Sequence, residues 1–213
     1  MYRKLIANGL IISCLGIQGG AAINSPNSTS SLEKIIEYFT PAEIITKNNL
    51  NEKLRLELLI MEEKDQNMLT GDNYNPSVIL QNTSRLKEII REFGWPTYNL
   101  VGEDGAHAAW LVIQHADNNP HFQEYCLALF EDAVKNKQAS KQDLAYLTDQ
   151  VLVNQGKEQL YGTQFYLNEN GNFGPRPIKD EPNIDARRKE MDLLWSFNDY
   201  KSLMLERYNF KNN

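Results

Sequence analysis

Side chains that can carry acid–base chemistry gather in one apolar stretch of the chain. Residues 105–117 place His107, Gln114 and His115 among alanines and aliphatic residues that cover nearly the whole circumference of a helix. Such a helix is normally buried, and burying a polar side chain without a partner costs about 1–3 kcal/mol. We therefore expect each of the three side chains to find a hydrogen-bond partner on another element.

The three polar side chains do not share one face of this helix. His107 and Gln114 are seven residues apart and lie about 20° from each other, so they form one narrow polar seam. His115 points elsewhere. One interpretation makes His115 a general acid/base in a pocket lined by His107 and Gln114. The other makes all three satisfied core residues that determine how the helices pack.

Two carboxylates fall on the apolar faces of other predicted helices. Asp65 interrupts the apolar stripe of a helix over 51–68, and is either a functional inward carboxylate or a solvated residue beyond a shorter helix. Asp149 lies at least half-buried on a helix over 140–153. It is either the acidic partner of His115 or a structural acceptor for the Trp95 turn or a nearby ribbon.

A helix-to-strand junction supplies further candidates. Gly162 permits positive φ or a close backbone approach, so Tyr161 and Gln164 are predicted to face a shared pocket, with Gln159 beside them. Tyr161 is a candidate catalytic residue, and Gln159 and Gln164 are candidate ligand-binding residues. The alternative is a turn whose side chains cap neighbouring backbone.

An arginine pair near the carboxyl end offers two readings. Arg187 and Arg188 either bind an anionic group, with Arg187 as the ligand-binding candidate, or form a solvated helix face.

Metal, nucleophile and cofactor chemistry are not expected. His115 and Asp117 are two residues apart on a helix and do not face each other, so a metal set with His121 is rejected. Cys126 falls in an inward row and is read as core. The chain has no HExxH, no GxSxG, no phosphate-binding glycine loop and no GxGxxG, so we expect no cofactor.

The elements that must position these residues are mostly helices. The pattern predicts a mainly α, compact helical bundle whose buried central helix spans about 105–117, with one small β-hairpin over about 164–178 turned at Asn170-Gly171. A helix starting at Thr83 or Ser84 precedes the central helix. Another follows Pro120 and turns Tyr125 inward. Further helices are expected over 32–39, 51–68, 140–153, 184–195 and 197–207.

The amino terminus predicts export. A short basic start and an apolar stretch resemble a signal peptide over 1–22, or alternatively a lipoprotein signal that ends before Cys14, which would then be lipidated. Residues 23–31 read as a flexible tether and 32–213 as a single helical domain. We expect the protein in the periplasm or cell envelope, or secreted. Its membrane contact would be confined to a lipidated N-terminus.

Charge excludes one class of partner. The net charge is −6, and loss of residues 1–22 would remove two lysine or arginine residues and no acid, giving −8. With no run of Lys or Arg to offset this, no nucleic-acid partner is expected.

Several short motifs occur together, each weak alone but fairly specific in this order. They are Phe93-Gly94-Trp95-Pro96, Val101-Gly102, Gln114-His115-Ala116-Asp117, Ala145-Tyr146-Leu147-x-Asp149, Gln159-x-Tyr161-Gly162-Thr163-Gln164 and Asp185-x-Arg187-Arg188. From about Leu58 to Tyr200 the chain resembles a bacterial family described only as a domain of unknown function (number 6624). The resemblance implies no reaction. It does imply Arg directly after Asp149, where this chain has Gln150, so an activity that needs this arginine would be lost here.

Two functions follow from these residues. The first is an exported helical module of the cell envelope that binds an unknown small molecule or an envelope protein, with the polar cluster structural or ligand-binding. The second is an envelope enzyme of hydrolase or lyase type that uses His115 with Asp149 or Asp65 for acid/base chemistry.

Overall fold

The computed structural model describes residues 50–70 and 75–212. In this part the chain is mainly α-helical, with one small antiparallel hairpin, as the sequence predicts. The helices are α3 (Glu52–Thr70), α4 (Pro76–Phe93), α5 (Tyr98–Gln114), α6 (Pro120–Lys135), α7 (Lys141–Asn154), α8 (Ile184–Glu190) and α9 (Phe197–Asn212), with a 3-10 turn, η1 (Glu181–Asn183), before α8. The predictions of a signal peptide over 1–22, lipidation at Cys14, a tether over 23–31 and a helix over 32–39 lie outside the described residues.

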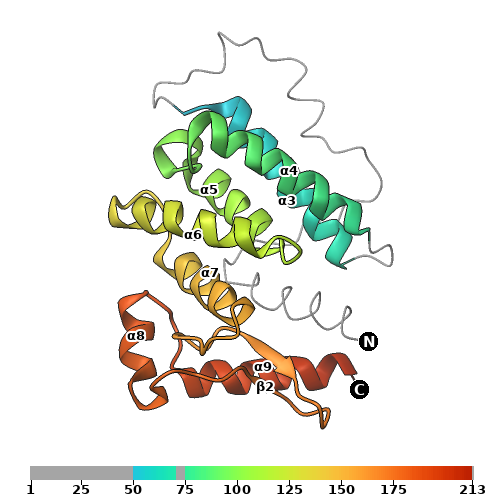
Figure 1. The fold of residues 1–213 in the computed structure, drawn as a ribbon, viewed down its shortest axis with the longest axis vertical. Coiled ribbons are helices and arrows are strands. Elements are labelled where there is room, and N and C mark those ends of the chain that lie inside the picture. The colour runs from blue at the N-terminus through green and yellow to red at the C-terminus, as the bar shows by residue number, and fades with distance from the viewer. Residues whose placement is uncertain (1–49, 71–74, 213) are drawn as a thin grey trace.

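The elements gather at the two ends of the longest axis of the molecule, with one helix between them. Figure 1 shows α3 to α6 packed at one end, the hairpin, α8 and α9 at the other end, and α7 between them. No helix of residues 50–70 and 75–212 has both the length and the apolarity that crossing a membrane requires.

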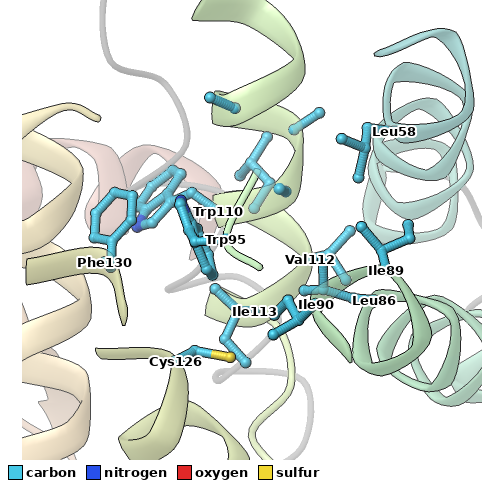
Figure 2. Packing of buried hydrophobic residues seen from close by; sticks show 14 of the residues in the cluster. Leu58, Leu86, Ile89, Ile90, Trp95, Trp110, Val112, Ile113, Cys126 and Phe130 are labelled. Atoms are coloured by element: carbon cyan, nitrogen blue, oxygen red, sulfur yellow. The ribbon is translucent and has the colours of Figure 1, made fainter. Parts of the chain in front are cut away.

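Helix α5 lies at the centre of the larger apolar core. Every residue from Gly105 to Ala116 is buried except His107, which is half-buried, so the predicted burial of this segment is confirmed. Figure 2 shows the core on both sides of α5, with Trp95 and Phe130 on one side and the aliphatic side chains of α3 and α4 on the other. The rings of Trp95 and Phe130 pack edge to face, with their centroids 4.9 Å apart.

The bounds of α5 differ from the prediction of 105–117. The helix begins earlier, at Tyr98, and leaves helical geometry at Gly102, where φ is 75° and ψ is 173°. Because φ in this region favours glycine, Gly102 can adopt the kinked conformation without the strain that a side chain would add. The helix ends at Gln114, so His115 lies at its carboxyl-terminal cap.

The predicted start of α4 at Thr83 or Ser84 is wrong. The helix begins two turns earlier, at Pro76. Asn75 is the N-cap, and its side-chain oxygen accepts a hydrogen bond from the Ser77 amide at 3.1 Å. Proline suits the first helical position because its missing N–H has no intrahelical partner there, so Asn75-Pro76 starts the helix.

The predicted inward position of Tyr125 is also wrong, because its side chain is 56% exposed. The buried row of α6 runs through Phe122, Cys126 and Phe130 at intervals of four residues. Tyr125 lies one residue outside that row, on the solvent side.

The hairpin lies within the predicted range of 164–178. Strands β1 (Phe165–Leu167) and β2 (Phe173–Pro175) pair antiparallel, with Tyr166 opposite Gly174. The aromatic rings of the hairpin pack with Trp195 against Tyr200 and Met204 in a second apolar cluster. The site residues on α7 and in the 159–164 segment therefore lie between two cores.

Candidate functional site

His115 is paired with Asp65 inside the bundle. The imidazole Nδ1 is hydrogen-bonded to Asp65 Oδ2 on α3, and the two side chains are 2% and 1% exposed. Asp65 therefore lies within α3 and not in a solvated loop. The pair has the geometry in which a carboxylate orients an imidazole, but its burial separates it from solvent.

Asp149 holds the segment that follows α7. Its carboxylate accepts hydrogen bonds from the amides of Leu160 (2.7 Å), Tyr161 (3.1 Å) and Thr163 (3.0 Å), and from the Thr163 hydroxyl (3.0 Å). Burial raises the pKa of Asp149, and these donors oppose that rise. The side chain is fully buried and its oxygens accept hydrogen bonds from backbone amides. This geometry is that of a structural residue that fixes the conformation of the following segment.

Two arginines of α8 hold the same segment through its carbonyls. Arg187 donates to the carbonyl of Leu160 at 2.9 Å, and Arg188 donates to the carbonyl of Tyr161 at 2.6 Å and to that of Trp195 at 2.9 Å. The expectation of a solvated arginine face is wrong, because Arg188 is only 3% exposed. We call Leu160–Thr163 the clamped loop, since its amides and carbonyls are bound from α7 and α8.

Glycine is required in the clamped loop. Gly162 has φ of 71°, and a Cβ there would lie 2.6 Å from the Phe197 ring. The loop therefore packs directly against the start of α9. Tyr161 is half-buried, and burial together with the charge of Asp149 raises the pKa of its phenol.

Gln159 joins the clamped loop to the hairpin. Its side-chain amide donates to the carbonyls of Gln164 (3.0 Å) and Arg176 (2.8 Å), and its oxygen accepts from the Gln164 amide (2.8 Å). The fully buried Gln159 side chain thus connects the backbone just before β1, at Gln164, with the backbone just after β2, at Arg176. This geometry matches the reading of a turn whose side chains cap neighbouring backbone.

The polar seam of α5 faces α7. His107 Nδ1 lies 3.0 Å from Asp143 Oδ2, and Gln114 donates to Gln150 Oε1 at 3.5 Å. Both pairs are separated by 36 residues in sequence, so the two helices run in the same direction with matched polar positions. Gln150 therefore contacts the central helix at the position where the resemblance implies arginine.

A glutamine from α6 closes the carboxyl end of α5. Gln123, fully buried, donates to the carbonyls of Ile113 (3.0 Å) and Gln114 (3.4 Å) and to Asp117 Oδ1 (3.5 Å). Burial raises the pKa of Asp117, while His115 and Gln123 oppose the rise. Carbonyls at a helix end need such donors because they have no intrahelical partner.

The candidate residues thus form separate groups. His115 is bonded to α3, Asp149 to the clamped loop, and His107 to α7. No group of three or more His, Cys, Asp or Glu side chains in the described part of the chain is placed to hold a metal ion.

Sequence reasoning missed several partners. Neither Asp143 nor Gln123 was among the candidate site residues. The one available signal was the spacing of seven between Asp143 and Gln150, which repeats the spacing of His107 and Gln114.

The sequence model described as "Family of unknown function (DUF6624)" matches residues 52–213. The chain belongs to this family. No curated protein and no solved structure matches it. The match begins at the first residue of α3 and therefore includes both cores and all the groups described above.

Proposed function

We propose that this DUF6624 member is an exported module of the cell envelope whose helical domain binds a small molecule or an envelope protein. The observation that carries the proposal is the state of Asp149, which is fully buried and bonded to three amides of the clamped loop. A carboxylate used in this way does not present itself to a substrate. Arg187 and Gln159, two of the ligand-binding candidates, are likewise bonded to backbone carbonyls, so the proposed ligand would contact other residues.

A thermal-shift screen tests the binding proposal. The chain without residues 1–22 is melted in the presence of peptidoglycan fragments and envelope metabolites. A ligand at 100 times its Kd stabilises the folded state by about 2.7 kcal/mol, which raises the Tm of a domain of this size by about 5–10 °C. If no compound of such a panel moves the Tm, the small-molecule part of the proposal fails, and purified envelope proteins become the next probes.

Cell fractionation tests the export proposal. The full chain and its Cys14→Ser variant are expressed in a bacterium, and the periplasmic, membrane and cytoplasmic fractions are probed. Lipidation predicts that the native chain is in the membrane fraction and that the variant leaves it. Cleavage after Ala22 predicts a soluble exported product from both chains. Retention of both chains in the cytoplasm would contradict export.

The second candidate function is an envelope enzyme of hydrolase or lyase type. It is favoured by the pairing of His115 with Asp65, because a carboxylate on one imidazole nitrogen is the arrangement of an acid/base dyad. His115→Gln and Asp65→Asn test it. A catalytic pair predicts loss of turnover with little change in Tm. A structural pair predicts a loss of about 3–5 kcal/mol, because one member of a buried pair is left unpaired.

A further inference from the structure

His107 differs from His115 in its access to solvent. Both imidazoles have Nδ1 on a carboxylate, but the side chain of His107 is 41% exposed and that of its partner Asp143 is 15% exposed. The side chain of His115 is 2% exposed. A substrate can therefore approach the ring of His107 and not that of His115.

The His107–Asp143 pair is held in place by the core beneath it. The His107 ring stacks on Trp110, with ring centroids 5.0 Å apart and an interplanar angle of 30°. The indole nitrogen of Trp110 donates to the backbone carbonyl of Asp143 at 2.9 Å, and Ser140 caps the Asp143 amide at 3.1 Å. Trp110 is 1% exposed, so one buried side chain determines the position of both members.

The charges around His107 favour a proton on this face. Burial opposes protonation of the imidazole, but its hydrogen bond to Asp143 and the charges of Asp143 and Glu62 outweigh burial and raise the pKa of His107. On α3, burial raises the pKa of Glu62, with His107 opposing and Asp104 and Asp65 adding to the rise. Both shifts favour the protonated form of the two neighbouring groups.

We propose that His107, positioned by Asp143, is the proton-transfer residue of a site for a small uncharged ester on the solvent-facing side of α5 and α7. The inference rests on the second candidate function, the envelope hydrolase, and moves its catalytic residue from His115 to His107. The nucleophile in the proposed step is water; within residues 50–70 and 75–212 the side chain hydrogen-bonded to His107 is that of Asp143.

The step balances with water as the only co-reactant. Neutral His107 accepts a proton at Nε2 from water while the water oxygen bonds to the ester carbonyl carbon. The imidazolium, stabilised by Asp143, then donates that proton to the leaving alkoxide as the carbon–oxygen bond breaks. The products are a carboxylic acid and an alcohol.

The surroundings select against anionic substrates. Asp143 and Glu62 are carboxyl groups, and the chain carries a net charge of −6. The guanidinium of Arg55, whose side chain lies beside Gly105 of α5, is already bonded to Asp104 and Glu52. An uncharged ester avoids the repulsion that an anionic one would meet.

Hydrolysis of p-nitrophenyl acetate by the purified full chain tests the proposal. General acid–base groups contribute about 100- to 10,000-fold, so His107→Gln is expected to lower kcat/KM by at least about tenfold. His121→Gln is the matched control, because His121 is exposed and belongs to neither pair. Asp143→Asn should lower the rate and also shift the midpoint of the pH–rate profile downward, because the pKa of His107 then loses the contributions that raise it.

Each outcome decides the matter. Turnover that His107→Gln leaves unchanged overturns this inference and leaves the envelope hydrolase standing. Turnover no faster than the uncatalysed reaction overturns both. A fall in rate with an unmoved pH midpoint in Asp143→Asn removes the positioning role. An NMR titration of the His107 ring proton in the native chain provides the pKa without relying on a variant that must fold.

Discussion

At the scale of single residues, buried polar side chains mainly organise backbone. Asp149 and Gln159 are both fully buried. Asp149 accepts from amides of the segment between α7 and the hairpin, and Gln159 donates to the carbonyls of Gln164 before the hairpin and Arg176 after it. A buried donor or acceptor left without a partner costs about 1–3 kcal/mol. Burial of a polar side chain is therefore not sufficient to identify a functional site, because these two buried residues have structural roles.

Asp149→Asn should be strongly destabilising. The substituted amide group places donors against the amides of Leu160, Tyr161 and Thr163, so the expected loss is about 3 kcal/mol and the Tm falls by about 6–12 °C. Thermal melting followed by circular dichroism measures the change. Asp132→Asn is the control, since that side chain is 73% exposed, and should melt within about 1 °C of the native chain. Equal melting of both variants would contradict a structural role of Asp149.

The pKa shift of His107 predicts a dependence of stability on pH. A histidine whose pKa is raised by folding stabilises the protein fully below its unfolded pKa of about 6.5, and this contribution is lost as pH rises through the folded pKa. The free energy of unfolding should therefore fall from pH 6 to pH 8. Urea titrations should show a smaller fall in His107→Gln than in His121→Gln. Identical slopes in the two variants would contradict the shift.

At the scale of elements, short segments link the helices through backbone groups. The clamped loop has its amides on α7 and its carbonyls on α8, while Gly162 packs against Phe197 at the start of α9. The loop is thus the junction of three helices. Its conformation depends on the positive φ of one glycine and on the absence of a side chain there.

Substitution of two glycines by alanine separates these effects. Gly171→Ala meets no atom within 4 Å at φ of 78°, so it should cost about 1–2 kcal/mol of backbone strain alone. Gly162→Ala has the same strain and also places a Cβ 2.6 Å from the Phe197 ring, which should add about 1–3 kcal/mol. Chemical denaturation of both variants gives the comparison. An equal loss of unfolding free energy in the two variants would mean that α9 shifts to make room for the added methyl group.

At the scale of the whole molecule, two apolar cores are joined by polar contacts around α7. The larger core surrounds α5, and the smaller one lies between the hairpin and α9. Arg188 links them because it is buried, stacks on Tyr200 and bonds to the clamped loop. Burial lowers the pKa of Arg188, and the charges of nearby tyrosines and aspartates oppose the fall.

Arg188→Ala should loosen the smaller core while leaving the larger one intact. Amides of residues 159–212 should exchange hydrogen at least about tenfold faster, whereas those of α3 to α6 keep their rates, because opening becomes local. Hydrogen exchange followed by mass spectrometry locates the change. Arg85→Ala is the control, since its ion pairs to Glu57 and Glu88 lie at the surface. Uniform acceleration over the whole chain would show one cooperative unit.

Helical periodicity in the sequence determined the burial of α5, and Asn170-Gly171 determined the place of the hairpin, because both signals depend on neighbours within a few residues. The same local rules predicted that His115, Gln114 and Asp149 need partners. Tertiary structure alone decided which partners these are, since Asp65 lies 50 residues from His115 and Gln150 lies 36 from Gln114. Packing also left the His107 side chain partly exposed to solvent and enclosed that of His115. Residue spacing along one helix could not predict this, because it does not specify which other elements pack on each face of that helix.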